Sequence, residues 1–227
     1  MSYKRTIVCL ANSTKHYPSR CIAGKEWGAT GPGRWLRPVT DYKVDEGAIP
    51  LLSSRLQDRS QPQLLDVIQI PLGRAVPHGC QLENHLITDD PWLKQGRLNW
   101  ANLEAMVENH PDLWGSGNSS VDGLNDRLSL QDGARQPDSL RLVRPNNLRI
   151  VVSKTSFGKK GMRALFDIGK TSYSLKVTDP RYTGRINQHE LDVEYPIQGA
   201  ILCVSIGEPW NGYYYKLLAT IFSQQDF

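Results

Sequence analysis

The chain has 227 residues and a formal net charge of +4, with 39% hydrophobic and 22% charged residues. This composition is typical of a folded globular protein and excludes a disordered or fibrous chain. No apolar run reaches the ~18 residues that a membrane-spanning helix needs, so the sequence predicts no membrane partner.

Cysteine usage and the start of the chain indicate a compartment. The apolar run Ile7–Ala11 is shorter than the core of a signal peptide. Four cysteines without a CxxC pair do not predict a disulfide framework. We therefore expect the protein in the reducing cytoplasm.

The modest net charge hides two basic segments. Residues 4–43 hold eight basic and two acidic residues, a net charge of +6. Residues 149–185 hold nine basic and two acidic residues, a net charge of +7. The intervening segment and the tail are acidic, with net charges of −5 and −4. Like-signed segments are usually solvated faces, but two that converge in space would form a groove for a polyanion.

In the first half, β-branched and apolar runs predict short strands at Arg5–Leu10, Gly33–Val39, Leu65–Ile70 (closed by Pro71) and Leu82–Ile87. One segment, Trp100–Asn109, has the apolar spacing of a helix, with Asn99 as its N-cap and His110-Pro111 as its stop. Residues 115–147 are rich in Gly, Ser, Asn, Asp and Pro, which predicts a long loop or interdomain connection.

The last eighty or so residues have almost only strand patterns. The expected strands are Arg149–Lys154, Met162–Ile168, Ser172–Val177, Gly199–Ile206 and Tyr213–Phe222. Gly169-Lys170 predicts a tight turn, and Gly207–Gly212 a longer one. Five strands in a segment of this size fit a small closed barrel of OB or SH3-like type.

The densest polar segment is Asn12–Lys25, followed by Gly33–Pro38. Arg20, Lys25 and Arg37 could hold a phosphate, with Trp35 as a stacking platform. The segment is not a P-loop, because Gly24-Lys25 is followed by Glu26. In the alternative interpretation Trp35 fills the core and the basic residues line the rim, and for Trp35 itself burial is favoured.

Further candidate binding residues lie in the second half. Asn125, Asp126 and Arg127 form a polar cluster in the long loop, which a structural turn would also explain. Asp179 follows a strand and is interpreted first as part of the turn that ends it, with ligand binding as the second interpretation. Tyr173 and Tyr213 are candidate stacking rings, and strand alternation predicts that Tyr214 points away from its two neighbours.

Metal-binding and catalytic interpretations find little support in the spacing. The candidate zinc ligands match no paired-ligand pattern: Cys9, His16, Cys21, His78 and Cys80. A Cys21 nucleophile would rest on residue type alone. We expect no metal, no cofactor and no catalytic residue.

Eight short motifs, in order along the chain, resemble the family of dual-OB-containing domain proteins: Ile7–Ser13, Arg20–Lys25, Gly33–Val39, Gln81–Ile87, Gly123–Leu128, Ser139–Val143, Tyr173–Pro180 and Gly207–Pro209. The resemblance implies two OB-like barrels, nucleic-acid or nucleotide recognition, and an association with prokaryotic conflict or anti-phage systems. It supplies no catalytic residues.

The sequence thus predicts a mainly β protein of two small OB-like or SH3-like barrels with one short helix and long loop elaborations. The expected domains are residues 1–147 and 148–227. The expected function is a nucleic-acid or nucleotide-binding module, a sensor or targeting component of an anti-phage system. The alternatives are an adaptor that holds a defence effector protein and, third, an enzyme acting on nucleotides or nucleic acid through Asp126, Asp179 or Cys21.

Overall fold

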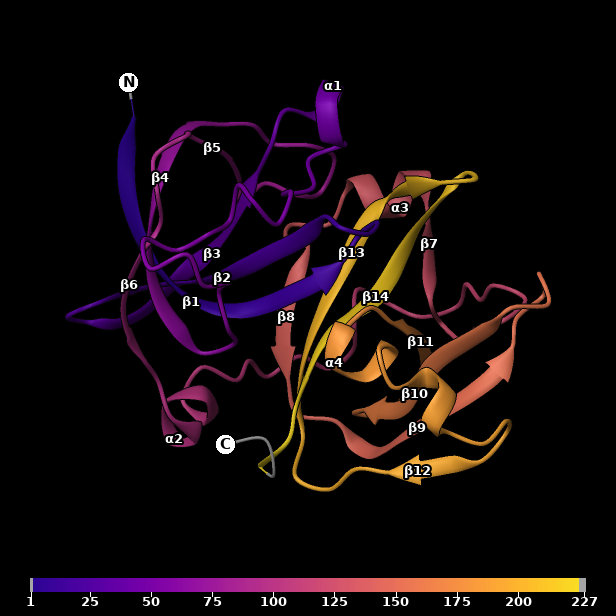
Figure 1. Cartoon of the computed structure of the whole chain (residues 1–227). Helices are drawn as coiled ribbons and strands as arrows, with labels where there is room; N and C mark the ends of the chain where they lie inside the picture. Colours follow the sequence, from indigo (N-terminus) through magenta and orange to yellow (C-terminus); the bar gives the residue numbers. More distant parts are fainter. Residues whose placement is uncertain (1, 225–227) are drawn as a thin grey trace. The chain divides into compact units, whose positions relative to one another are not determined.

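A computed structural model describes residues 2–224, except for the side chains of residues 44 and 45. The chain divides into two compact units, Met1–Met106 (the N-terminal unit) and Val107–Phe227 (the C-terminal unit). Each contains one sheet, and strands dominate both (Figure 1). The expected mainly β architecture is confirmed. The described residues hold four short α-helices instead of the single one expected.

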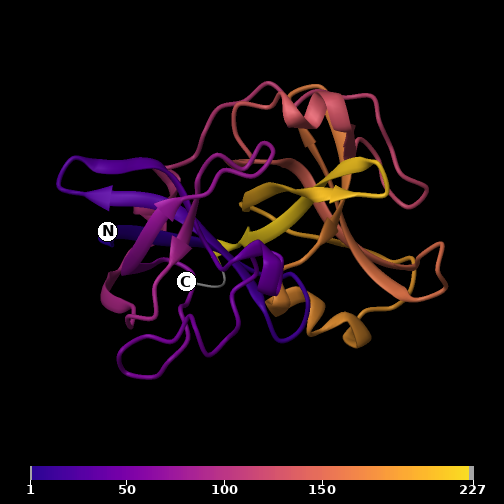
Figure 2. The same cartoon turned by 90° about the horizontal axis from the view of Figure 1, so that it is seen from above.

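The N-terminal unit is a closed five-stranded barrel. Its strands are β1 (Tyr3–Thr14), β2 (Arg20–Gly28), β3 (Gly31–Val39), β4 (Asp66–Ala75) and β5 (Asn84–Ile87). Their spatial order is β1-β2-β3-β5-β4, and β4 pairs back onto β1. Only β3 and β5 are parallel. β6 (Leu93–Arg97) adds to β4, and the β2–β3 hairpin extends from the barrel (Figure 2). This is the five-stranded barrel of an OB fold.

Alternating apolar residues of these strands fill the barrel. The core is formed by Ile7, Cys9, Ile22, Leu36, Ile49, Leu56, Ile68, Ile70, Leu72 and Trp92. Gly24 allows β1 and β2 to approach closely, because a Cβ there would lie 1.9 Å from the carbonyl oxygen of Val8. The barrel therefore requires glycine at the position that was expected in a phosphate-binding loop.

Two short helices belong to this unit, α1 (Tyr42–Asp45) and α2 (Trp100–Glu104). Asn99 caps α2 as expected, with reciprocal hydrogen bonds to Asn102. The helix is shorter than the expected Trp100–Asn109, because the backbone N–H of Glu108 donates to the carbonyl of Leu142 instead of continuing the helix.

The C-terminal unit repeats the same strand order. Its barrel strands are β9 (Asn146–Lys154), β10 (Lys160–Ile168), β11 (Thr171–Val177), β13 (Ile201–Trp210) and β14 (Tyr213–Phe222). They are arranged β9-β10-β11-β14-β13, and the third and fifth strands are again the parallel pair. Unlike the N-terminal barrel, β9 pairs with β12 (Glu194–Pro196) and β13 with β8 (Leu140–Val143). Two OB-like barrels are thus present, as expected.

The prediction of a long loop at residues 115–147 is wrong. It contains β7 (Arg127–Ser129), α3 (Leu130–Ala134) and β8. β7 pairs with β14 and β8 with β13, strands that follow much later in the chain. Residues 107–147 therefore lie in the C-terminal unit, and the boundary falls after Met106 instead of at the expected 147/148.

Other boundaries also differ. The polar segment 12–25 is mostly strand, and Lys15–Ser19 alone connects β1 to β2. β4 continues through Pro71, whose carbonyl still accepts a hydrogen bond from Thr88. The remaining helices are α4 (Pro180–Thr183) and the 3-10 turn Ile186–Gln188. In the part of the chain that is described, no helix is long and apolar enough to cross a membrane.

Candidate nucleic-acid interface

Three aromatic side chains gather at the end of the β13–β14 hairpin. Trp210, the last residue of β13, is 56% exposed, and its ring lies 5.8 Å from that of Tyr215. Tyr213 and Tyr215 are partly exposed on one face of β14, whereas Tyr214 is buried on the other. The predicted alternation is confirmed, and it leaves three rings on the outer face.

Arg127 lies over one of these rings. Its guanidinium carbon is 3.9 Å from the centre of the Tyr213 ring. β7 carries Arg127 alongside β14, and Nε donates to Asn118 Oδ1 at 3.2 Å, which fixes the orientation of the side chain. A guanidinium stacked on a ring supplies positive charge without leaving the aromatic surface.

The segment 117–126 is held by two of the predicted residues. Asp126 is buried and accepts hydrogen bonds from Ser120 N–H (2.7 Å), Ser120 Oγ (2.6 Å) and Arg163 Nη2 (2.8 Å). Asn125 accepts from Gly117 N–H at 2.7 Å and donates to the carbonyl of Ser172 at 3.0 Å. A Cβ at Gly123 would lie 1.9 Å from the Asp126 carboxylate, so a larger residue there would displace the Asp126–Arg163 ion pair.

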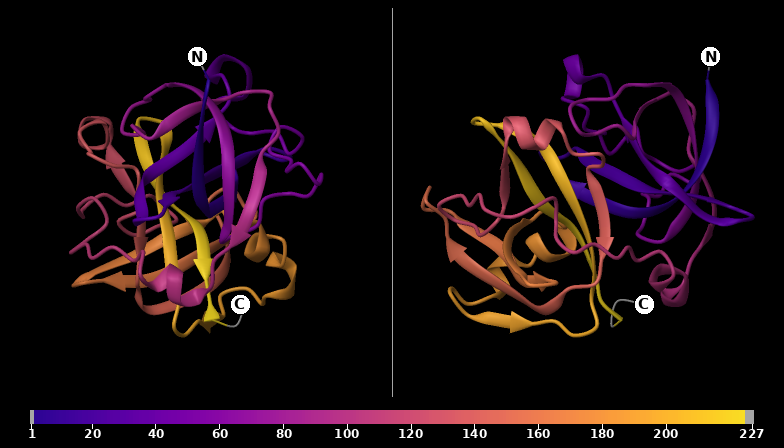
Figure 3. Two further views of the ribbon diagram at one scale, coloured as in Figure 1. Left: turned by 90° about the vertical axis from the view of Figure 1, so that its left-hand side faces the viewer. Right: turned by 180° about the vertical axis from the view of Figure 1, so that it is seen from behind.

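The same segment reaches the end of the β9–β10 hairpin. Asp122 accepts hydrogen bonds from the backbone N–H (2.9 Å) and the hydroxyl (3.0 Å) of Ser156. The next residue, Phe157, is 76% exposed. Lys154, Lys159 and Lys160 beside it are also exposed. In Figure 1 and the right-hand view of Figure 3 both hairpin ends lie on one side of the C-terminal unit.

Hydrogen bonds therefore connect the two hairpin ends into one surface. We call it the aromatic–basic face, and it consists of Arg127, Lys154, Phe157, Lys159, Lys160, Trp210, Tyr213 and Tyr215. Exposed rings stack on unpaired bases, and lysines attract the phosphate backbone that links them. Of these residues, the sequence pointed to Arg127 and Tyr213 individually and to the three lysines as part of the basic segment 149–185. Phe157 and Trp210, each beside a turn glycine or asparagine in the sequence, were missed as site residues.

The predicted residues of the N-terminal unit are engaged within that unit. Arg20 donates to Thr14 Oγ1 at 2.7 Å, and its backbone pairs with Ile49. Lys25 is buried, and its Nζ donates to the carbonyl of Met106 at 3.1 Å. Both side chains therefore have hydrogen-bond partners within the N-terminal unit.

Trp35 and Arg37 lie on β3 and are also in contact with their own unit. The Lys25 ammonium lies 5.5 Å from the Trp35 ring, which is only partly exposed. Arg37 is buried and forms an ion pair with Glu83 at 3.1 Å. Strands β2 and β3 thus hold the residues that the sequence suggested as a phosphate-binding loop.

Two predicted residues of the C-terminal unit have structural positions. Tyr173 is 1% exposed, stacks on Phe166 and accepts a hydrogen bond from Leu113 N–H at 2.8 Å. Burial raises its pKa above the usual value. Its ring cannot stack on a ligand base in this conformation, which corrects that expectation.

Asp179 is buried and caps α4. It accepts hydrogen bonds from the backbone N–H groups of Arg181 (3.0 Å) and Ile221 (3.1 Å) and pairs with Arg181 Nη2 at 2.8 Å. These contacts tie the helix to β14. This matches the alternative in which the residue ends a strand.

The residues suggested as zinc ligands do not lie together in one site within residues 2–224. Among the described residues, no group of three or more His, Cys, Asp or Glu side chains is placed to hold a metal ion. Cys9 lies in the barrel core, where burial raises the pKa of the thiol to about 12. Such a thiol stays protonated and unreactive at neutral pH.

Comparison with known proteins gives one family. The family model described as "Dual OB-containing domain" matches residues 5–221. No curated protein matches. A solved structure, "Crystal structure of the tetrameric p202 HIN2", is similar at 10% identity and a TM-score of 0.28, over 98% of this chain and 93% of that chain. A similarity of this size carries no argument about function.

Proposed function

The chain belongs to the dual OB-containing domain family, and we propose that it binds single-stranded nucleic acid on the aromatic–basic face of its C-terminal unit. OB barrels bind oligonucleotides through the loops that connect the first and second strands and the fourth and fifth strands. Here these connections are the ends of the β9–β10 and β13–β14 hairpins.

The arrangement of rings at the β13–β14 end is the observation that carries the proposal. Trp210, Tyr213 and Tyr215 share one face, and Arg127 is stacked on Tyr213. Stacking of a base on an aromatic side chain contributes ~1–3 kcal/mol and tolerates any base. The bases of a duplex already stack on each other, so these rings favour single strands.

The lysines at the β9–β10 end supply the second component. Lys154, Lys159 and Lys160 are exposed, and the hydrogen bonds between Asp122 and Ser156 fix the loop that carries Phe157 among them. A single-stranded nucleic acid lying along the segment 117–126 would have its bases on the aromatic rings and its phosphates near the lysines. Binding should then weaken as salt rises, because lysines that neutralise phosphates release counterions.

The proposal also includes a biological role. The association of the family with prokaryotic conflict systems supports a sensor or targeting component of an anti-phage system in the cytoplasm. A defence effector protein would then be the partner that acts once nucleic acid is bound. This part rests on the family association, whereas the binding proposal rests on the face itself.

The experiment is a fluorescence-polarisation titration of the full chain with labelled single-stranded DNA, single-stranded RNA and duplex of equal length, at 50 and 200 mM salt. We expect tighter binding of a single strand than of duplex, and loss of affinity at the higher salt. Equal binding of duplex and single strand, or no binding at low salt, would contradict the proposal.

A further inference from the structure

The rings of the aromatic–basic face do not by themselves distinguish one base from another, because every base has a π-face that can stack. Sequence information in nucleic-acid complexes comes from contacts to base edges, whereas contacts to phosphates carry none directly. Of the residues that form this face, Arg127 has the chemistry for such a contact, because its guanidinium group carries several donors in one plane. Its surroundings therefore decide whether the face can prefer one base.

Strand pairing places Arg127 beside the rings. In the antiparallel pair β7–β14, Arg127 is directly opposite Tyr215, and Ser129 is opposite Tyr213. The side chains of directly opposed residues lie on the same face of a sheet. The Arg127 side chain therefore shares the outer face of Tyr213 and Tyr215, and a base stacked on these rings has Arg127 as its neighbour.

Two contacts fix the orientation of the guanidinium group. Its carbon lies 3.9 Å from the centre of the Tyr213 ring, a distance at which the planar group lies flat on the ring. Nε donates to Asn118 Oδ1 at 3.2 Å, and the backbone N–H of Arg127 donates to the carbonyl of Asn118 at 3.3 Å. The side chain is therefore restrained at both ends, which lowers the entropy that it loses when a ligand binds.

The two terminal nitrogens of Arg127 remain as donors. Within residues 2–224, neither Nη1 nor Nη2 donates to a protein acceptor. The carboxylate next to it in the sequence, Asp126, is buried and is engaged by Ser120 and Arg163 instead. Arg127 itself is partly exposed. Its Nη atoms therefore form a pair of parallel donors that a ligand can use.

We propose, as an inference that rests on the proposed function, that Arg127 makes the face prefer a guanine at one position of the bound strand. Guanine carries two adjacent acceptors, O6 and N7, and a bidentate contact to them is the commonest specific contact of arginine with a base. Adenine and uracil carry no two adjacent acceptors. Cytosine offers O2 and N3 in a single strand, but guanine has the larger ring system to stack on the neighbouring side chains.

A phosphate is the other ligand that a guanidinium group binds through two nitrogens. Two features of the face favour a base instead. The guanidinium of Arg127 lies on the Tyr213 ring, which places it at the level of stacked bases. The exposed lysines at the end of the β9–β10 hairpin supply cations for the phosphates. A phosphate contact would give no preference among bases, so the base preference separates the two roles.

Fluorescence polarisation of the full chain with single-stranded runs of adenine tests the inference. One position, moved along the strand, carries guanine, cytosine or 7-deazaguanine, which has a carbon in place of N7. At the best position guanine should raise the affinity at least about fivefold, the lower end of what a bidentate contact discriminates, and 7-deazaguanine should lose most of that gain. Tight binding without a preference for guanine over adenine or cytosine, or with undiminished affinity for 7-deazaguanine, would overturn this inference alone. Absence of binding to every oligonucleotide would overturn the proposed function as well.

The variant Arg127→Lys assigns the preference to the guanidinium group. Lysine keeps the positive charge but has a single nitrogen, so the ratio of the affinities for guanine and adenine should fall to near one. Arg34→Lys changes an exposed arginine of β3 in the N-terminal unit and is the matched control, with an unchanged ratio. A preserved ratio in a folded Arg127→Lys protein would contradict the assignment. If circular dichroism shows that this variant does not fold, the comparison of guanine with 7-deazaguanine on the natural chain still decides.

Discussion

The two basic segments of the chain have similar charge, but their basic side chains differ in how many contact partners within the protein. In residues 4–43 the basic side chains mostly face partners in their own unit: Arg5 pairs with Glu26, Arg37 with Glu83, and Lys25 donates to the carbonyl of Met106. In residues 149–185 three of the four arginines form ion pairs: Arg149 with Glu194, Arg163 with Asp126 and Arg181 with Asp179. The lysines of that segment, at positions 154, 159, 160, 170 and 176, are exposed.

This contrast shows that charge density along a sequence does not identify a binding surface. Lys25 on β2 and Arg163 on β10 occupy the second strand of their barrels, and a loop or turn outside the barrel contacts each of them. Of the exposed lysines of residues 149–185, Lys154, Lys159 and Lys160 lie at the end of the β9–β10 hairpin, whereas Lys176 lies on β11. In the proposed binding mode, the lysines at the hairpin end contact the ligand.

The largest expected effect is on stability. Arg163→Ala would leave the buried Asp126 carboxylate without its ion-pair partner, and removing one partner of a buried pair lowers the unfolding free energy by about 3–5 kcal/mol. The partly exposed pair Arg5–Glu26 should contribute less than about 1 kcal/mol, so Arg5→Ala is the matched control. Chemical denaturation measures both, and equal losses would refute the contrast.

Lys216 is the buried exception among the lysines of the C-terminal unit. It is 1% exposed, donates to the carbonyl of Gly115 at 2.8 Å and lies 5.3 Å from the centre of the Tyr173 ring. Burial lowers its pKa to about 8, against the raising effects of Asp112 and Asp126. Between pH 8 and its ordinary value of 10.5, the unfolded chain therefore binds more protons than the folded chain.

Stability should consequently rise with pH across this window by up to about 3 kcal/mol from Lys216 alone. The variant Lys216→Met lacks this contribution. The difference in unfolding free energy between the natural chain and the variant should therefore shift in favour of the natural chain from pH 8 to pH 10. Denaturant titrations at several pH values provide the comparison. Parallel pH profiles for the two proteins would show that the lysine is not desolvated.

The aromatic rings should have the next largest effect. Removing two of them, in Trp210→Ala/Tyr213→Ala, should weaken binding of a single-stranded oligonucleotide about 100-fold, since each stacked base contributes ~1–3 kcal/mol. Tyr17 of the N-terminal unit, whose side chain is 88% exposed, provides the control. In fluorescence polarisation, Tyr17→Ala should bind the oligonucleotide with unchanged affinity. A larger loss of affinity in Tyr17→Ala than in the double variant would indicate a site in the N-terminal unit.

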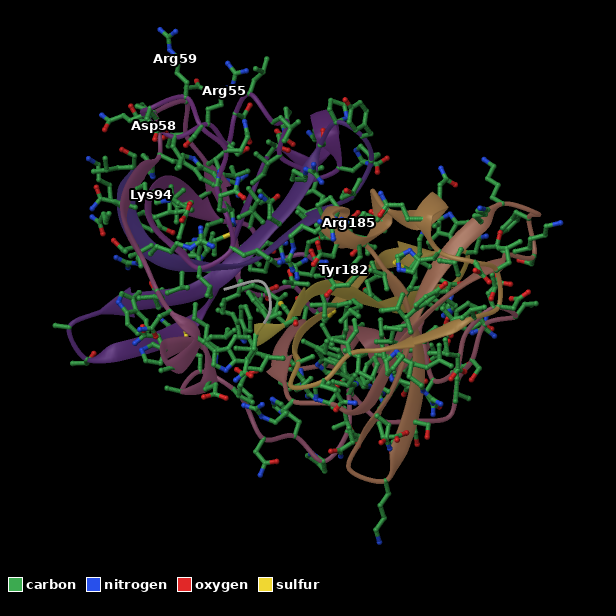
Figure 4. The ribbon with its side chains drawn as sticks, turned by 60° about the horizontal axis from the view of Figure 1, so that its bottom comes forward. Arg55, Asp58, Arg59, Lys94, Tyr182 and Arg185 are labelled. Carbon is green, nitrogen blue, oxygen red and sulfur yellow. The ribbon has the colours of Figure 1, made fainter. Side chains whose placement is uncertain are left out.

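The smallest expected effect concerns charge. Lys159→Gln/Lys160→Gln should lower the magnitude of the slope of log affinity against log salt by about 1.4, at roughly 0.7 per phosphate contact on a single strand. Arg55→Gln/Arg59→Gln removes two exposed charges from the N-terminal unit, where both side chains extend from one loop near Asp58 and Lys94 (Figure 4). A salt slope that falls equally in both pairs would indicate attraction to the whole chain instead of to one face.

Local patterns predicted the strands well where the pairing is local. β14 has the expected bounds Tyr213–Phe222, and β10 and β11 meet at the expected Gly169-Lys170 turn. β7 and β8 were missed because their partners are β14 and β13, which follow much later in the chain. β2 was missed because its polar residues resembled a ligand loop.

The candidate site was predictable only in part for the same reason. Arg127 and Tyr213 drew attention separately, but their stacking depends on pairing between β7 and β14. Asp126 and Arg163 are 37 positions apart and meet only in the folded unit. Phe157 stands out in the structure because the Asp122–Ser156 hydrogen bonds place the hairpin end beside a second exposed loop.

Photocrosslinking tests the central claim most directly. A single-stranded oligonucleotide with 5-iodouracil at successive positions is irradiated with the full chain, and the crosslinked peptides are identified by mass spectrometry. We predict crosslinks to Trp210, Tyr213, Tyr215 or Phe157, reduced by an excess of unlabelled single strand. Crosslinks confined to residues 15–43 of the N-terminal unit would contradict the account.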